Sequence, residues 1–144
     1  MPRKHKSLMV QMTPRGKGRP RFARKTGVAY TPAETREAEA TIRGAWQAYH
    51  GPEMETAVPR SLTIEATYKM PSSWSETKKA KFHGELCHRK HDADNVLKLV
   101  ADALNGLAYR DDRQIPDERA IKLWGDESSI AVDIEYEEEA ESHE

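Results

Sequence analysis

The chain has 144 residues, a formal net charge of −1 and a single cysteine, Cys87. This length predicts one domain, residues 1–144, that folds without a disulfide or structural metal, because about 70% of the unfolded surface of such a chain becomes buried. One cysteine excludes an intrachain disulfide, and no apolar run approaches the roughly 18 residues of a membrane span. The first residues contain too short an apolar run for a signal peptide, so we expect a cytoplasmic protein with no membrane partner.

The small net charge hides a strong asymmetry along the chain. Residues 1–33 contain nine Lys or Arg and no acid, whereas residues 123–144 contain nine Asp or Glu and no Lys or Arg. Because local potential steers binding, the near-neutral total does not exclude a polyanionic partner. The acidic end, 137–144, is expected to be a solvated tail without a functional role.

The first third of the chain predicts a strand, a basic loop, a short strand and a helix. SLMVQMT (7–13) is typical of a strand, and the Gly- and Pro-rich stretch 14–27 predicts a loop before a short strand at VAYT (28–31). Pro32 then opens a helix over 33–50. Its apolar residues recur at helical spacing: Ala38, Ile42, Ala45, Trp46 and Tyr49.

The remaining two thirds predict alternating strands and helices. RSLTIEATYKM (60–70) alternates like a half-buried strand, and 72–82 could form a short helix with Ser73 and Glu76 as a capping box. A third helix begins near Asp94 and ends at Asn105–Gly106. Its apolar residues define one buried face: Leu97, Val100, Ala101, Leu104 and Ala108. With strands expected at 118–124 and 129–136, the fold class is α+β, a small mixed sheet of about four strands packed with two main helices.

Charged residues surround this third helix: Asp92, Asp94, Lys98, Asp102, Asp111 and Asp112. Three of them recur every four residues along one edge of its apolar face, and the last two follow in a turn that could fold back toward the helix start. Each has an ordinary explanation when taken alone, as an N-cap at Asp94, a solvated ion pair or a hydrophilic turn. Clustered carboxylates repel one another, however, unless a hard cation such as Mg²⁺ lies between them.

Two other kinds of metal site fit the sequence less well. An EF-hand loop starting at Asp92 would have Leu97 where a glycine is needed and Ala103 where a glutamate is needed, which excludes calcium sensing of that type. Zinc donors occur at His83, Cys87, His88 and His91. They lack a second ligand pair of familiar spacing, so zinc is the weaker alternative.

The stretch DADNVLKLVADALNGLAYRDDRQI (92–115) resembles the signature of the RusA family of Holliday junction resolvases. The pattern D-x-D-N-x-x-K, then D-A-L-N-G, then Y-x-D-D-x-Q-I is long and ordered. KGRPRF (17–22), YTP (30–32) and MPSSW (70–74) also resemble phage-type members, and the similarity spans residues 8–136. One departure is His91, where such members usually have a proline.

The resemblance implies catalytic roles for Asp92, Asp94, Asp112 and Lys98. The three aspartates would bind Mg²⁺, for which Mn²⁺ can substitute, and Asp102 and Asp111 are secondary candidates that support them. It also implies a homodimer that cleaves four-way junction DNA. The chemistry agrees, because phosphodiester hydrolysis needs an activated water and neutralisation of phosphoryl charge, which a carboxylate-bound metal assists.

The basic loop supplies candidate DNA contacts: Lys17, Arg19, Arg21, Arg24 and Lys25. Interleaved with Gly and Pro, these cations suit a segment that tracks phosphates better than a helix that reads a groove. The alternative is a disordered solubilising segment, but beside an acidic site DNA binding is favoured. We therefore expect a Mg²⁺-dependent junction endonuclease, with a non-catalytic junction- or branched-DNA-binding protein on the same scaffold as the alternative.

Overall fold

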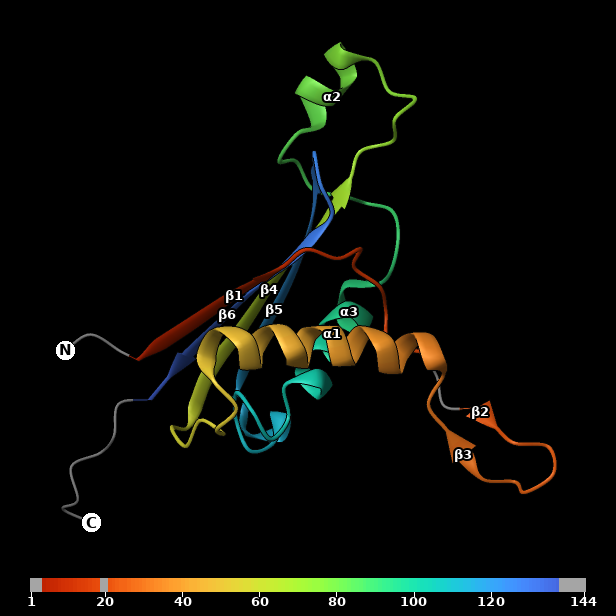
Figure 1. Cartoon of the computed structure of the whole chain (residues 1–144). Helices are drawn as coiled ribbons and strands as arrows, with labels where there is room; N and C mark the ends of the chain where they lie inside the picture. Colours follow the sequence, from red (N-terminus) through yellow and green to blue (C-terminus); the bar gives the residue numbers. More distant parts are fainter. Residues whose placement is uncertain (1–3, 19–20, 138–144) are drawn as a thin grey trace.

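The structure, a computed structural model, describes residues 4–18 and 21–137, apart from the side chains of Arg21 and Tyr30. Its main sheet has four strands in the order β1-β6-β4-β5 (Figure 1). These are β1 (His5–Val10), β4 (Pro59–Lys69), β5 (Asp117–Gly125) and β6 (Ser129–Tyr136). The β4–β5 pair is parallel and the other two pairs are antiparallel, which confirms the α+β class and the mixed sheet.

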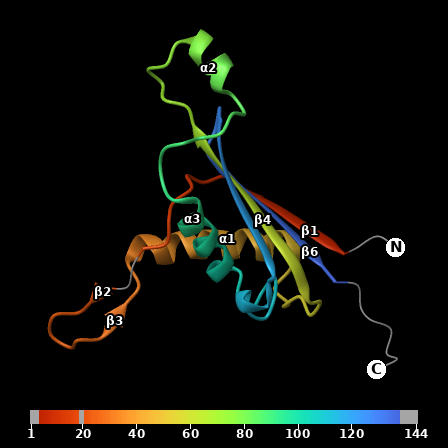
Figure 2. The same cartoon turned by 180° about the vertical axis from the view of Figure 1, so that it is seen from behind.

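Two helices, α1 (Ala33–His50) and α3 (Ala93–Ala103), pack against each other and against one face of the sheet (Figures 1 and 2). The bounds of α1 match the predicted 33–50 because Pro32 sets its start and Gly51, at φ 92°, its end. Arg43 of α1 donates hydrogen bonds to the carbonyls of Ala103 and Asn105, at 2.9 and 2.7 Å. This cation satisfies carbonyls at the C-terminal end of α3 and fixes that end against α1.

The core lies between this helical layer and the sheet. The predicted inward face of β4 is confirmed, because Leu62, Ile64, Ala66 and Tyr68 are all buried. They pack with the alternate buried residues of β6 and with the apolar face of α3, which has the highest density of buried side chains among the helices. Because β4 and β5 are parallel, the chain must cross over between them, and α3 forms part of that crossover.

The predicted basic loop contains a small hairpin, so the loop assignment over 14–27 is partly wrong. Strands β2 (Arg21–Phe22) and β3 (Ala29–Tyr30) pair in an antiparallel manner and project from the end of α1 (Figures 1 and 2). Two-residue strands carry no measurable alternation of polarity, which is why the pattern showed only a loop and a short strand. We call residues 21–30 the hairpin.

A second projection, which we call the arm, comprises residues 71–90 and carries α2 (Glu76–Phe82) beyond the end of the sheet (Figure 1). The predicted capping box with Ser73 is wrong, because the N-cap is Ser75, whose hydroxyl accepts from the Lys78 amide at 3.2 Å. Trp74 stacks near Trp124 and Phe82, with ring centroids 5.0 and 5.2 Å away. Through these rings the arm packs against the main core at Trp124 of β5.

Two predicted boundaries differ from those that tertiary pairing sets. The first strand ends at Val10 rather than residue 13, because β6 pairs with it only that far. Helix α3 ends at Ala103, so Leu104 and Ala108 are buried beyond the helix rather than on its face. In the described ranges, 4–18 and 21–137, no helix is long and apolar enough to cross a membrane.

Candidate active site

Helix α3 places a charged edge beside its apolar face. Asp94, Lys98 and Asp102 follow one another at intervals of one helical turn. Asp94 and Lys98 are exposed and Asp102 is half-buried, so the three lie at the border between core and solvent, as the spacing predicts. The buried Val96, Leu99 and Val100 hold the helix against the sheet. The edge is therefore fixed in position although its polar side chains face outward.

Two carboxylates at the start of α3, those of Asp92 and Asp94, do not cap the helix. The N-cap is Asp92, with extended backbone angles, and its carbonyl accepts from the amides of Asn95 and Val96 at 3.1 and 3.2 Å. Its side chain makes no capping hydrogen bond. The simple explanation of Asp94 as an N-cap is therefore wrong, since Asp94 lies inside the first turn. Both carboxylates are exposed.

Two buried tyrosines fix the segment that follows α3. The hydroxyl of Tyr109 donates to the carbonyl of Ala101, and that of Tyr136 donates to the carbonyl of Ala108, both at 2.7 Å. The amide of Asp112 then donates to Oδ1 of Asn105 at 2.8 Å. These contacts bring the Asp111–Asp112 turn to the last turn of α3, not to its first turn as the sequence suggested.

The carboxyl group of Asp112 lies near that of Asp102 and also near that of Glu118, and we call these three residues the acid cluster. Partial burial raises the pKa of Asp112, and the nearby carboxyls of Asp111 and Asp102 raise it further. Partial burial and Asp112 also raise the pKa of Glu118, while Lys98 lowers it. Raised carboxyl pKa values mean that the cluster holds its full negative charge unfavourably.

Glu118 was missed by the sequence reasoning, although a signal for it exists. In β5 it pairs in register with Leu62 of β4, whose side chain is buried beneath the helices. Side chains at paired positions of neighbouring strands point to the same face of the sheet. An acid at the first predicted residue of the strand 118–124, in phase with Trp124, therefore indicated a carboxylate on the helix-covered face.

Asp111 has a local structural role at the turn. Its carboxylate accepts from the Arg113 amide at 3.0 Å and from the Arg113 guanidinium at 3.1 and 3.2 Å. Together with Gln114 it forms a capping box on the short 3₁₀ helix Asp112–Gln114. The Arg113 amide, followed by its guanidinium, lowers the pKa of Asp111. The secondary role of Asp111 in the site stays a prediction.

Lys17, predicted as a DNA contact, is tied to the acid cluster in this structure. Its Nζ donates to Asp102 and lies 3.5 Å from a carboxylate oxygen of Glu39. Partial burial lowers the pKa of Lys17, but the two carboxylates more than offset it, so the pKa is raised. Its backbone amide also donates to the carbonyl of Asn95 at 3.1 Å. Lys17 therefore links the basic loop to α3.

The other predicted DNA contacts divide into two groups. Arg24 and Lys25 are exposed at the turn of the hairpin, as a phosphate contact requires. Arg19 lies outside the described residues, and the side chain of Arg21 is not described. The DNA-binding role of all five cations stays a prediction.

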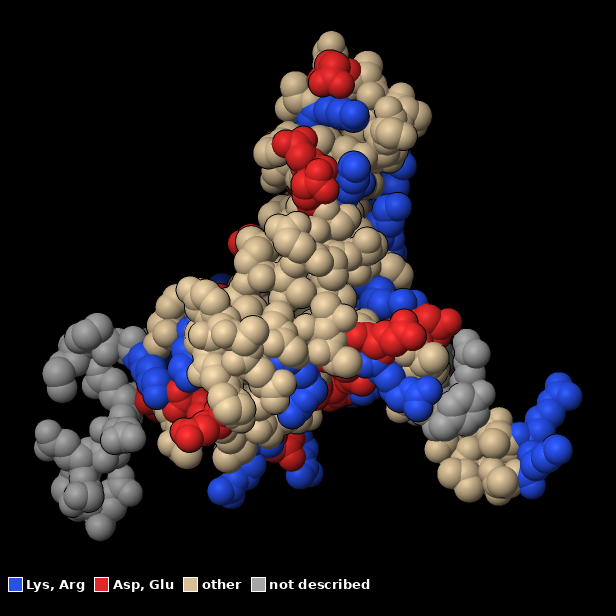
Figure 3. Space-filling view, viewed as in Figure 1, with Lys and Arg blue, Asp and Glu red and all other residues tan. Residues whose placement is uncertain are grey.

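A second basic patch, which the sequence reasoning missed, surrounds His91 just before Asp92. Partial burial lowers the pKa of His91, and the positive charges of Arg15, Lys122 and Lys90 lower it further. The Nζ of Lys122 donates to the carbonyl of Arg89 at 2.7 Å, and Lys90 has a left-handed backbone with φ 74°. Figure 3 shows Lys and Arg atoms along one side of the arm down to the helices. Only the folded chain brings these distant residues together.

The donor chemistry of the site fits a hard cation, although the ligands are not gathered. All acidic candidates offer carboxylate oxygens, which Mg²⁺ prefers, and the raised pKa values of Asp112 and Glu118 favour a compensating positive charge. Within the described part of the chain, no group of three or more His, Cys, Asp or Glu could hold a metal ion as arranged. That finding covers the zinc alternative too, in which Cys87 is buried. The metal ligands stay a prediction.

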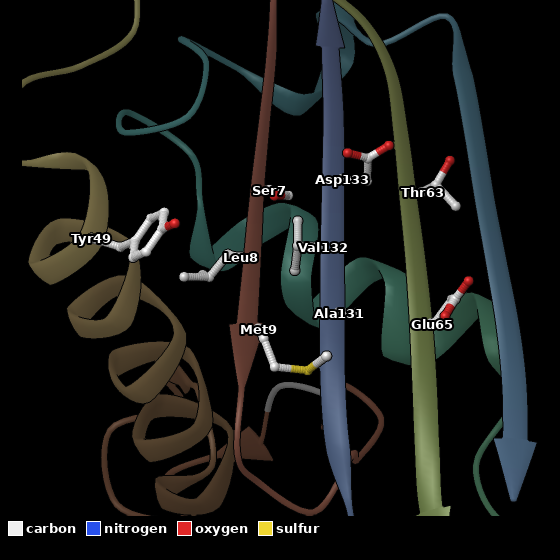
Figure 4. A pocket seen from close by; sticks show the side chains of 9 residues that line it. All are labelled: Ser7, Leu8, Met9, Tyr49, Thr63, Glu65, Ala131, Val132 and Asp133. Atoms are coloured by element: carbon white, nitrogen blue, oxygen red, sulfur yellow. The ribbon is translucent and has the colours of Figure 1, made fainter. Parts of the chain in front are cut away.

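A pocket of about 540 Å³ lies elsewhere, on the sheet face opposite α3 (Figure 4). Its lining includes Met9, Glu65 and Asp133, which point away from the helices (Figure 4). None of the acid cluster residues lines it. The acid cluster and this pocket therefore lie on different faces of the sheet.

We expect Asp112→Asn to stabilise the protein in the absence of metal. The substitution removes one of the repelling charges, so the free energy of unfolding at pH 7 should rise by up to about 1 kcal/mol. Because the folded pKa of Asp112 is raised, the cost of its charge is present at neutral pH and disappears as pH falls below the ordinary carboxyl range. Denaturant unfolding at pH 7 and pH 3.5 measures the difference.

The control for this prediction is Glu127→Gln, which neutralises an exposed acid in the β5–β6 turn. It should change stability little at either pH. A loss of stability on Asp112→Asn at pH 7 would contradict the repulsion inferred from the acid cluster.

Comparisons with known proteins give one family and one relative. The family model described as Endodeoxyribonuclease RusA matches residues 11–135. An uncharacterized protein of Bacillus subtilis strain 168, YqaN, is 32% identical over 127 residues, which cover 84% of this chain and 89% of that protein. The matched region includes both ends of α3, the acid cluster and the hairpin.

Proposed function

Because the chain belongs to the RusA family of endodeoxyribonucleases, we propose that it resolves four-way DNA junctions by metal-dependent hydrolysis of phosphodiesters on two opposing strands. The observation that carries this proposal is the charged edge of α3, where exposed carboxylates and Lys98 lie beside the acid cluster on a rigidly packed helix. Phosphodiester hydrolysis requires both kinds of charge, negative for a metal and positive for the phosphate.

Asp92, Asp94 and Asp112 are the residues that would hold Mg²⁺ or Mn²⁺. When bound, the ion supplies neutralisation of phosphoryl charge and lowers the pKa of a coordinated water. Joint binding by these three requires the Asp112 carboxylate to move from Asp102 toward the helix start, since Asp94 and Asp102 are eight residues, or about 12 Å, apart along α3. Repulsion inside the acid cluster favours that departure.

Lys98 provides the positive charge that the chain itself contributes. It lies one turn from Asp94 on the same exposed edge, and its positive charge lowers the pKa of Glu118. In this position Lys98 can contact a non-bridging oxygen of the scissile phosphate or orient the attacking water. Asp102 and Glu118 are positioning residues, which act through Asp112 and Lys98.

DNA backbone binding would use cations on both sides of this edge. Arg24 and Lys25 extend from the hairpin, while Arg15, Lys90 and Lys122 surround His91 next to Asp92. Phosphate contacts position a duplex without reading its sequence. Cleavage of two opposing strands further requires two sites, which an isologous homodimer supplies.

A non-catalytic junction-binding protein is the second candidate. The observation that favours it is that no three metal-ligating side chains are gathered among the described residues. It predicts the same DNA binding without hydrolysis. The two candidates therefore differ only in whether product forms.

The deciding experiment incubates the protein with a mobile synthetic four-way junction and a matched linear duplex, each with Mg²⁺ and with EDTA. We expect paired cleavage of the junction alone, and only with Mg²⁺. Junction binding without product in either Mg²⁺ or Mn²⁺ would overturn the catalytic proposal in favour of the second candidate. Equal cleavage of the duplex would overturn junction specificity.

Removing Arg24 and Lys25 together by alanine substitution should weaken binding to junction and duplex alike. Each lost phosphate contact is expected to reduce the slope of log affinity against log salt by about 0.9. Titrations between 50 and 200 mM salt measure this slope. Lys4→Ala is the control, because Lys4 directly precedes β1 and the start of that strand lies far from the hairpin (Figure 1). An unchanged slope would remove the hairpin cations from the DNA interface.

A further inference from the structure

The hairpin carries two exposed apolar side chains among its cations. The side chains of Phe22 and Val28 are 70% and 62% exposed, and they are two of the six large hydrophobic residues exposed in the described part of the chain. Burying a phenylalanine ring is strongly favourable, yet this fold leaves Phe22 in water. On a projecting element that also carries cations, this aromatic ring is open to a partner that could cover it.

The hairpin is an ordered element with a fixed root. The amide of Ala23 donates to the Val28 carbonyl at 3.0 Å, and that of Gly27, at φ 67°, donates to the Ala23 carbonyl at 2.8 Å. At the root, the Gly18 amide donates to the hydroxyl of the buried Thr35 at 3.0 Å. A Cβ at Gly18 would lie 2.7 Å from that hydroxyl oxygen, so the close approach requires glycine.

The root of the hairpin also contacts the candidate active site. The Lys17 amide donates to the carbonyl of Asn95, the residue that follows Asp94. Phe22 is five residues beyond Lys17, so an extended chain places it within about 17 Å of this contact. The length of this segment therefore limits how far the exposed ring can lie from the proposed catalytic carboxylates.

The charges around Phe22 define the class of partner. Arg24 and Lys25 lie within three residues of it, and residues 1–33 contain no acid. Cations next to an aromatic ring fit a nucleic acid whose base faces are open, because phosphates pair with the cations and a base stacks on the ring. In a continuous duplex the base faces are already stacked on one another. At the centre of a four-way junction they are accessible.

We propose that Phe22 stacks on a base at the branch point and makes the protein selective for junctions over linear duplex. This inference rests on the proposed junction-resolving function and adds a structure-selecting residue to it. The cations then supply affinity for any DNA, whereas Phe22 supplies the preference for a branch. Given the reach of the hairpin and about 3.4 Å per nucleotide, cleavage should occur within about five nucleotides of the branch point.

The test compares Phe22→Ala and Phe22→Trp in protein that also carries Asp94→Asn, so that binding is measured without cleavage. Phe22→Ala should weaken junction binding about 5- to 100-fold and leave duplex binding and the salt slope unchanged. Phe22→Trp should retain junction binding. A junction with 2-aminopurine at the branch point should change fluorescence on binding of the Phe22 protein and not on binding of Phe22→Ala.

Val28→Ala is the matched control, since it removes an exposed apolar side chain from the same hairpin. Equal junction affinity with and without Phe22, an equal loss on duplex, or a fluorescence change that persists in Phe22→Ala would each overturn the stacking role. Binding of phosphatidylserine vesicles that depends on Phe22, with unchanged junction affinity, would identify a membrane surface as the partner instead. Junction selectivity that survives Phe22→Ala would overturn this inference alone, whereas a parent protein without junction preference would overturn the proposed function as well.

Discussion

Asp94→Asn is expected to abolish junction cleavage while the fold and junction binding remain. Asparagine has nearly the same shape but no formal charge, so it weakens a cation site with little change in packing. Asp94 is exposed in the first turn of α3, where losing its favourable interaction with the helix dipole should cost about 0.3–1 kcal/mol. The cleavage rate should fall by about 10³-fold or more.

Three measurements on the same preparation separate the possible roles of Asp94. Single-turnover cleavage gives the rate, gel-shift titration gives junction affinity, and thermal unfolding gives stability. Asp126→Asn neutralises an exposed acid beside His83 in the β5–β6 turn and should leave all three nearly unchanged. Wild-type cleavage by Asp94→Asn would show that Asp94 is not a metal ligand.

Long periodic elements were predictable from the sequence because local and tertiary preferences agree there. Helix α1 has one apolar stripe, a proline at its start and a glycine after its end, so its bounds match the prediction. Strand β4 alternates strictly, and its inward face was identified residue by residue. For α3, the apolar stripe gave both the helix and the exposed edge that carries Asp94 and Lys98.

The arrangement of the acidic residues was harder to predict because it depends on contacts between distant segments. Asp112 turns toward Asp102 because Tyr109 and Asn105 hold the segment after α3. Lys17 reaches Asp102 from 85 residues away in the sequence. No local pattern encodes such contacts, and the hairpin was missed for the opposite reason, that its strands are too short to show any pattern.

In the free protein, lysine side chains offset part of the negative charge of the candidate site. Lys17 neutralises part of the charge of Asp102, and Lys98 acts on Glu118. A bound cation would compete with these lysines for the carboxylates, and DNA phosphates would compete with the carboxylates for the lysines. Metal binding and DNA binding are therefore expected to be coupled, with each raising the affinity for the other.

The last prediction concerns assembly, since a four-way junction has near two-fold symmetry and its resolution needs matched nicks on opposing strands. The chain has one set of the proposed site residues Asp92, Asp94, Lys98 and Asp112, so we expect two copies to act together. A dimer with one Asp94→Asn subunit, purified through two different affinity tags, should nick a cruciform plasmid and leave a nicked circle. The wild-type dimer with the same tags should give linear product. Linear product from the mixed dimer at the wild-type rate, or a monomer in sedimentation both free and on the junction, would rule out two cooperating sites.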